Sequence, residues 1–316
     1  MADVAVSPGG SVAIADWGLA EVNVLGSDGE WQGAVMTRGD GPGEVQAPAA
    51  VTWVDADTLL ILDLGTFRMV ALDVASRSAS VIPVDPAFLS PVFASGQVRF
   101  VALQPSRTVW LEYPGHGEDG WEERSFVRWS PENPVNDTVV MSLARGVGGV
   151  TLAAWPRSLL GVGAETWVVS HPDGRYELGV FDGAGRSLVR FCHTGEAFPL
   201  SPAERGEGTD EGMPVAWRDA LRELGEPRNP AIISRIVVDL DGRIWVQRDR
   251  PSPGAFDGHG APGAMYDIFR PSGRFLGSMR LPDEQRLLEA RGRSVWTLHT
   301  GPLGESSIVA LEIEGF

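Results

Sequence analysis

The sequence has only one cysteine, Cys192, so no disulfide can form within the chain. It has no apolar run near the ~18 residues that a membrane-spanning helix requires. A basic start followed by an apolar stretch, the pattern of a secretory signal, is also absent from the chain. These absences exclude a disulfide-stapled domain and a helical integral membrane protein.

Basic residues are outnumbered, with 26 Lys and Arg against 42 Asp and Glu, which gives a formal net charge of −16. A strongly acidic chain is a poor partner for nucleic acid or for an anionic membrane surface. We therefore expect no nucleic acid and no membrane insertion, although the total charge does not exclude a local basic site. Composition leaves the oligomeric state open.

Glycine and proline are abundant, at 39 and 23 residues, and are spread along the chain rather than gathered in one linker. A hydrophobic content of 43% is ample for a core, so this distribution indicates many short turns rather than disorder. All-β domains of this length commonly form one unit. The composition thus favours a single domain over residues 1–316.

One pattern recurs at the period of about 40–50 residues that is typical of propellers. It consists of an apolar strand, a turn, a second strand that often carries Trp, a third strand, a Gly turn and a fourth strand. The copies are 3–36, 49–84, 97–143, 158–192, 232–281 and 285–315. A small twisted sheet cannot bury both its faces alone, whereas radially stacked sheets can. The sequence predicts an all-β, six-bladed β-propeller, with an irregular β-sandwich as the alternative.

The last copy ends after its third strand, whereas the first copy has four strands that begin at Asp3. No segment ahead of Asp3 remains to complete the last blade. We therefore predict a three-stranded sixth blade with an open edge along Ile308–Phe316. We also expect that natural sequence ahead of Met1 has been removed.

Residues 193–230 interrupt the repeat between the fourth and fifth copies. Within them Val215–Leu224 has helical spacing, and Gly225 and Pro227 are stop signals. We expect a short helix over one end of the channel. A disordered acidic loop around Glu204–Glu211 is the alternative.

Three segments resemble bacterial six-bladed propellers of the NHL-like type: RGDGPGEVQAPAAV (Arg38–Val51), DGRIWV (Asp241–Val246) and PSGRFLGSMRLP (Pro271–Pro282). The resemblance covers essentially the whole chain. It implies an exported protein whose signal precedes the first blade, with a cytoplasmic protein as the alternative. The wider six-bladed class contains calcium-dependent lactonases and phosphotriesterases as well as non-catalytic binding modules.

Arginines recur near the start of the first strand when the copies are aligned on the Trp of the second strand. The position ten residues before that reference holds Asp3, Ala50, Arg157, Arg235 and Arg286, and Arg99 lies eleven before Trp110. We expect the third copy to have a turn that is one residue longer. A shared offset predicts one height around the axis, so these guanidinium groups should meet at one mouth of the channel.

Polar residues recur three positions after the same reference, and they should edge the same mouth. They are Asp16, Asp63, Tyr113, Ser170, Arg248 and His299, with His171 directly after Ser170. The candidate acid–base residues are His299, His171, Asp16 and Asp63. The candidate ligand-binding residues are Arg99, Arg157, Arg235, Arg286, Arg248 and Tyr113. For both histidines, a plain surface position is the alternative.

Converging guanidinium groups repel one another unless anions pair with them, and their planar forks suit phosphate, sulfate or carboxylate. The sequence therefore favours a propeller that binds a small anionic molecule at the channel mouth, with hydrolysis of its ester as an extension. The arginines could instead pair internally with Asp16, Asp63 and Glu112. That arrangement would leave a non-catalytic scaffold for a protein or a glycan.

Other chemistry is poorly supported by the residues. A lactonase-type calcium site needs converging Glu, Asn and Asp oxygens, and of the four asparagines only Asn229 comes near the inner register. We predict no metal ligands and no certain cofactor, with calcium as the one candidate. The segment Gly39–Glu44 lacks the lysine and the helix of a phosphate-binding loop, so we interpret it as an interblade turn. The blade tryptophans should pack rather than bind sugars.

Overall fold

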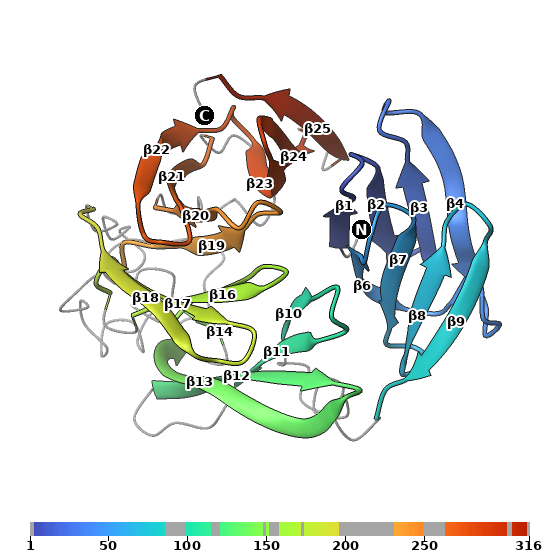
Figure 1. The fold of residues 1–316 in the computed structure, drawn as a ribbon, viewed down its shortest axis with the longest axis horizontal. Helices are drawn as coiled ribbons and strands as arrows, with labels where there is room; N and C mark the ends of the chain where they lie inside the picture. Colours follow the sequence, from blue (N-terminus) through green and yellow to red (C-terminus); the bar gives the residue numbers. More distant parts are fainter. Residues whose placement is uncertain are drawn as a thin grey trace. The chain divides into compact units, whose positions relative to one another are not determined.

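The computed structural model describes residues 3–85, 99–114, 121–147, 150–151, 158–171, 174–195, 231–248, 263–301 and 305–314. The regular elements among these residues are all strands, in six sheets that follow one another along the chain, one for each predicted copy (Figure 1). Neighbouring strands pair in antiparallel order in the first, second, fourth, fifth and sixth sheets, except for the short parallel β4–β5 pair. The predicted fold class, an all-β six-bladed propeller, is confirmed.

The first two sheets have simple up-and-down order. The first contains β1 (Asp3–Val6), β2 (Val12–Asp16), β3 (Glu21–Leu25), β4 (Trp31–Arg38) and β5 (Glu44–Val45). The second contains β6 (Pro48–Trp53), β7 (Thr58–Asp63), β8 (Arg68–Asp73) and β9 (Ser78–Pro83). β1 pairs with β2, as predicted for a strand that belongs to the first blade.

The third and fourth sheets follow the same order. The third contains β10 (Arg99–Leu103), β11 (Val109–Pro114), β12 (Trp121–Ser130), β13 (Asn133–Val147) and β14 (Val150–Thr151). The fourth contains β15 (Leu160–Val162), β16 (Thr166–Ser170), β17 (Glu177–Asp182) and β18 (Ser187–Cys192).

The fifth sheet contains β19 (Arg235–Val238), β20 (Ile244–Gln247), β21 (Met265–Phe269) and β22 (Phe275–Arg280). The sixth contains β23 (Gln285–Arg291), β24 (Ser294–Thr300) and β25 (Ser306–Glu312). Within the described ranges β23, β24 and β25 form a three-stranded sheet, as predicted for this copy, and no fourth strand joins β25. The predicted helix Val215–Leu224 lies outside the described residues. No helix among those described is long and apolar enough to cross a bilayer.

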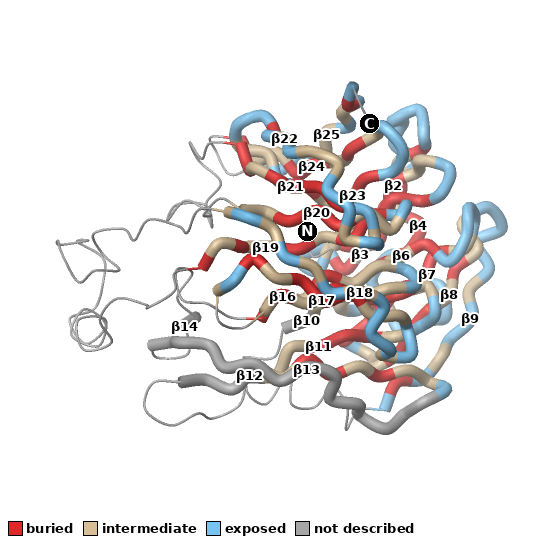
Figure 2. Tube along the Cα trace, turned by 60° about the vertical axis from the view of Figure 1, so that its left-hand side comes forward, coloured by how far each residue is buried: buried red, intermediate tan, exposed pale blue. Residues whose placement is uncertain are grey.

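The chain divides into two compact units, Met1–Tyr113 with Phe126–Val139 and Pro114–Ser125 with Val140–Phe316. In the first unit, β7 is buried on both faces because alternate residues point to opposite sides. Leu59 and Ile61 pack against the first sheet, whereas Leu60 and Leu62 pack with Val109 and other residues of the third. The outer strand β9 is mostly exposed (Figure 2).

In the second unit, the fourth, fifth and sixth sheets stack in chain order through two apolar clusters. Adjacent residues of β21 serve different clusters, since Phe269 packs toward the fourth sheet and Ile268 toward the sixth. Gly161 and Gly163 let β15 approach β19 closely. A Cβ on either glycine would lie 2.5 Å from a side-chain atom of Ile236 or Val238.

A polar contact joins the fifth and sixth sheets beside these clusters. Oε1 of Glu289, on β23, accepts the backbone N–H of Ala290 (2.8 Å) and that of Leu240 (3.2 Å), which lies in the β19–β20 turn. Burial raises the pKa of Glu289 to about 8, and the nearby carboxylates of Asp239 and Asp241 act in the same direction. The fold therefore favours a protonated Glu289.

We predict that Glu289→Gln stabilises the protein at high pH. Between the ordinary pKa of 4.5 and the folded value of about 8, the folded state holds a proton that the unfolded state has released. Stability that is present in acid is therefore lost as the pH rises through this range. Glutamine keeps the acceptor oxygen and removes this loss, so the variant should gain about 1–2 kcal/mol at pH 9 and little at pH 4.5. Urea unfolding at both pH values measures this difference.

Glu312→Gln, at an exposed position of the same sheet, is the matched control and should leave the pH slope unchanged. An equal slope in Glu289→Gln and the native protein would contradict the assignment.

Candidate functional site

The strand registers test the alignment that predicted the arginine position. In five sheets, the residue at the predicted arginine position of the first strand pairs with a residue of the second strand. That partner lies two residues after the tryptophan reference position. These pairs are Asp3–Ala15, Ala50–Leu62, Arg99–Glu112, Arg235–Gln247 and Arg286–Leu298. The shared backbone register is thus confirmed for Arg99, Arg235 and Arg286.

Two details of the alignment were wrong. In the fourth sheet Trp167 pairs with Val162, whereas in the fifth Trp245 pairs with Val237. The hairpin is three residues shorter, so Leu160 and not Arg157 occupies the shared register. Arg157 itself lies outside the described residues. In the third sheet the extra residue is a β-bulge between Phe100 and Ala102 rather than a longer turn.

Side chains at this register reach the neighbouring sheet. Oδ2 of Asp3 accepts the backbone N–H of Val51 at 3.0 Å, and Nη1 of Arg235 donates to the carbonyl of Leu287 at 2.8 Å. Val51 and Leu287 each follow the shared register by one residue in the next sheet. Asp3 and Arg235 therefore bind equivalent backbone positions in the sheets that follow them. Asp3 accepts the N–H at that position, whereas Arg235 donates to the C=O. Arg286 is exposed, and the Arg99 side chain lies outside the description.

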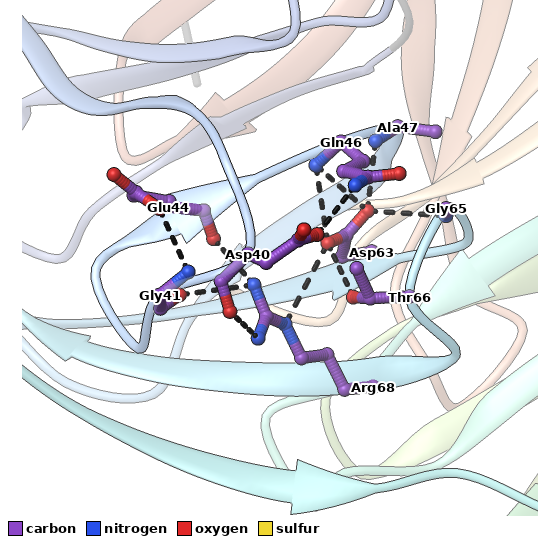
Figure 3. Close-up of polar contacts among 9 residues, drawn as sticks. All are labelled: Asp40, Gly41, Glu44, Gln46, Ala47, Asp63, Gly65, Thr66 and Arg68. Atoms are coloured by element: carbon purple, nitrogen blue, oxygen red, sulfur yellow. Dashed lines mark hydrogen bonds and ion pairs between the residues drawn. The ribbon is translucent and has the colours of Figure 1, made fainter.

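Asp63, predicted as a catalytic residue, ends β7 in the first unit with a fully buried carboxylate (Figure 3). Its oxygens accept the backbone N–H groups of Gln46, Ala47 and Gly65 and the hydroxyl of Thr66, at 2.6–3.3 Å. Nε of Arg68 lies 3.6 Å from Oδ2. Donors occupy both oxygens, which indicates that Asp63 fixes the chain between β5 and β6.

Arg68 holds the segment that was predicted to be an interblade turn. Its two terminal nitrogens donate to the carbonyls of Asp40, Gly41 and Glu44 at 2.8–3.0 Å (Figure 3). Glu44 in turn accepts the N–H of Gly41 at 2.7 Å. Both terminal nitrogens of Arg68 are already bonded to the loop, so they are not available to a ligand.

The other predicted residues of the first unit are Asp16 and Tyr113. Asp16 ends β2, and its Oδ1 accepts the N–H of Leu19 at 3.1 Å, which lowers the pKa of the carboxyl. Tyr113 packs on the apolar cluster around Leu60, and burial raises the pKa of its hydroxyl to about 12. These contacts place both residues without assigning chemistry to either.

The two predicted histidines lie in the second unit. Nε2 of His171 is 3.4 Å from a terminal nitrogen of Arg175, directly after β16. His299 is on β24 opposite Gln285. Its Nδ1 is buried and has no hydrogen-bond partner among the described residues. Arg286 and His299 thus lie at the same end of the sixth sheet, as Arg235 and Arg248 do in the fifth.

Arg248 belongs to a cluster that sequence reasoning missed. We define the Asp267 cluster as Tyr176, His193, Arg248, Asp267 and Ser278. Asp267 is fully buried, and its carboxylate accepts the hydroxyls of Tyr176 (3.0 Å) and Ser278. Nε of Arg248 lies 3.5 Å from Oδ1, and Nε2 of His193 lies 3.9 Å from Oδ2. One buried carboxylate thus holds two hydroxyls and two side chains that can carry positive charge.

Solvent reaches the cluster through its basic members. The side chain of Arg248 is 35% exposed and that of His193 is 26% exposed, whereas Asp267 is closed off. Nη1 and Nη2 of Arg248 donate to no described residue. Burial, and then the charge of Asp267, raise the pKa of Tyr176, so its hydroxyl stays protonated and donates to the carboxylate.

Aromatic rings fix the position of His193. Its ring stacks on Phe275 with centroids 4.7 Å apart and meets Tyr176 and Phe269 edge-on, each at 5.3 Å. The strands explain why these rings meet. Tyr176 directly precedes β17 and His193 directly follows β18, and both rings contact Phe269 of the fifth sheet. The imidazole is therefore held beside Asp267 by packing as well as by charge.

The sequence contained one signal for this cluster. Asp267 interrupts the apolar run of β21, MYDIF, where a strand buried on both faces should be apolar. A carboxylate in such a place requires partners. The alignment covered only the two inner strands of each copy and so did not include β21. No group of three or more metal-ligating residues that could hold an ion occurs within the described ranges.

No protein-family model matches the chain, and no curated protein matches it. Among solved structures, the calcium-binding protein regucalcin from Agrobacterium tumefaciens aligns over 99% of this chain and 90% of its own, with 10% identity and a TM-score of 0.46. Virginiamycin B lyase from Staphylococcus aureus aligns over 99% and 84%, with 9% identity and a TM-score of 0.40. Such weak similarity assigns no ligand or reaction, and the NHL-like resemblance stays a prediction.

We predict that Asp63→Asn destabilises the protein by about 2–4 kcal/mol. The amide would offer one acceptor oxygen where several N–H donors converge, and Arg68 would lose its counter-charge. Urea unfolding measures the change. Asp55→Asn is the matched control, because Asp55 accepts the N–H groups of Asp57 and Thr58 in an exposed turn that asparagine also tolerates. Similar stabilities of the two variants would show that Asp63 is dispensable.

Proposed function

We propose that this protein binds a small anionic molecule through the Asp267 cluster, with Arg248 as the anchor and His193 as a second donor. The carrying observation is that Asp267 takes only Nε of Arg248 and so leaves the two terminal nitrogens available. A guanidinium group presents these nitrogens as a planar fork that fits two oxygens of a carboxylate or a phosphate.

The charge balance of the cluster supports an anionic ligand. Asp267 and Arg248 neutralise each other, and Tyr176 and Ser278 are uncharged donors. His193 adds a ring N–H donor and no negative charge, so a bound anion meets no uncompensated carboxylate in the cluster. Burial of Asp267 fixes the guanidinium group in advance, so less side-chain entropy is lost on binding.

The contrast with Arg68 supports the choice of Arg248. Arg68 also lies beside a buried aspartate, but its terminal nitrogens donate to three backbone carbonyls. Arg235 likewise uses one terminal nitrogen on a backbone carbonyl. Arg248 has no such backbone acceptor among the described residues, so its fork has a ligand-binding role open to it.

Hydrolysis of an anionic ester is the extension that the cluster permits. His193 lies beside a buried carboxylate that would orient its ring, an arrangement that general acid–base catalysis uses. This version needs a substrate placed between Arg248 and His193. Export, which the resemblance implied, remains part of the proposal for the native protein.

We predict that Arg248→Ala weakens anion binding about 10- to 100-fold, the loss expected for one charge-assisted hydrogen-bonded group. Isothermal titration with inorganic phosphate, sulfate and acetate measures this change. His193→Ala should weaken binding roughly three- to tenfold, because it removes one donor and keeps the anchor. A hydrolase panel of phosphate, sulfate, carboxyl and lactone esters tests the extension.

The matched control is Arg186→Ala, which removes an exposed arginine of the same unit that is paired with Asp182 at 2.8 Å. It should bind each anion as the native protein does. Native protein that binds none of the three anions, or Arg248→Ala that binds them unchanged, would overturn the proposal.

A further inference from the structure

The outer edge of β25 differs from the same edge in the other sheets. In the second, fourth and fifth sheets a fourth strand of six residues, β9, β18 or β22, pairs with the third strand. β25 is the third strand of the sixth sheet, and among the described residues it pairs only with β24. In the part of the chain that the structure describes, its outer edge therefore has no fourth strand.

The hydrogen-bond pattern identifies which backbone groups lie at this edge. The N–H of Ile313 donates to the carbonyl of Arg293, and the N–H of Gly301 donates to that of Glu305. Both pairs continue the register in which Val309 faces Thr297. Bonds to β24 alternate along an antiparallel strand, so they involve the odd-numbered residues. The N–H and C=O groups of Ser306, Ile308, Ala310 and Glu312 point away from β24.

The existing fourth strands show what kind of segment fits such an edge. β18 alternates between Val189 and Phe191, which pack on the apolar cluster of its sheets, and the exposed Leu188 and Arg190. The pattern requires an extended segment of about six residues, with apolar side chains at alternate positions. An incoming strand gains backbone hydrogen bonds to the four residues of the open edge.

Charge selects among the segments that could occupy the edge. Glu312 and Glu314 are exposed at the end of β25, and the whole chain carries a formal charge of −16. A second copy would bring the same acidic strand and the same net charge to the edge, and like charges across neighbouring strands are unfavourable. A basic segment instead places arginine or lysine opposite these glutamates.

We propose that the open edge of β25 binds an extended basic segment of a partner protein by strand addition. The segment pairs with Ser306, Ile308, Ala310 and Glu312 and completes the sixth sheet with a fourth strand. This site is independent of the Asp267 cluster, since no residue belongs to both.

A labelled peptide copy of Arg186–His193 with Cys192→Ser is the probe, because this segment is basic and already forms a fourth strand in the same protein. Fluorescence anisotropy should show that the native protein binds the peptide. Ala310→Pro should weaken binding at least about tenfold, since it removes one N–H from the open edge and none from the β24 ladder. Ala310→Val keeps the N–H and should bind as the native protein does.

Two further variants provide a replacement for Ala310→Pro and a test of the charge preference. Ser306→Pro removes another outward N–H at the start of the strand, where proline is tolerated, and replaces Ala310→Pro if that variant fails to fold. Glu312→Lys should weaken binding of the basic peptide and strengthen binding of a copy in which both arginines are glutamate. Undetectable binding by the native protein, or equal binding by the folded proline variants, would overturn the proposal.

Hydrogen exchange separates the alternative occupants. The amides of Ile308 and Ala310 should exchange fast in the free protein and slowly with the peptide. Slow exchange in the free monomer would mean that the chain already covers this edge. Slow exchange that appears only with rising protein concentration would assign the edge to a second copy. Either result contradicts a partner segment.

Discussion

Burial of a sheet on both faces is the constraint on which the rest of this structure depends. β7 shows it most plainly, because five of its six residues are buried and alternate ones serve different neighbouring sheets. Such a strand has no face on which a polar side chain can reach water. Polar groups inside a stack of sheets must therefore find partners in the protein, as the buried carboxylates of Asp63, Asp239 and Asp267 do.

Buried carboxylates meet this demand in different ways. Asp63 is surrounded by backbone N–H groups, and Asp239 accepts the indole N–H of Trp245 and the Nε of Arg243 at 2.7 and 2.6 Å. Both bind donors that belong to turns and strands, and Arg243 also donates to the carbonyl of Gly292 at 2.7 Å. Asp267 instead lies beside two partly exposed side chains, those of Arg248 and His193. The same solution to burial is thus structural at two positions, and at the third it holds the side chains of the proposed anion site.

The sequence predicted the sheets and most of the inner-strand register, because both follow from short-range patterns. Counting from the tryptophan aligned five copies correctly. In the sixth sheet a shorter hairpin and a bulge compensate, and in the third the bulge makes the spacing eleven residues. The same count failed in the fourth, where the hairpin is three residues shorter and no tryptophan count reveals it. Side-chain direction was harder still. Arg235 points to a neighbouring backbone, and only coordinates show the carbonyl of Leu287 that receives it.

An acidic protein that binds an anion is physically consistent when the site is local. The field of exposed charges decays over about 8 Å at physiological ionic strength. A ligand at Arg248 therefore responds mainly to groups within that distance, and these include a guanidinium group, an imidazole and two hydroxyl donors around one neutralised carboxylate. The acidic remainder of the surface acts instead on large partners, whose charges extend over many Debye lengths. In the proposed function, the net charge disfavours nucleic acid and anionic membranes as partners, whereas the Asp267 cluster binds the small anion.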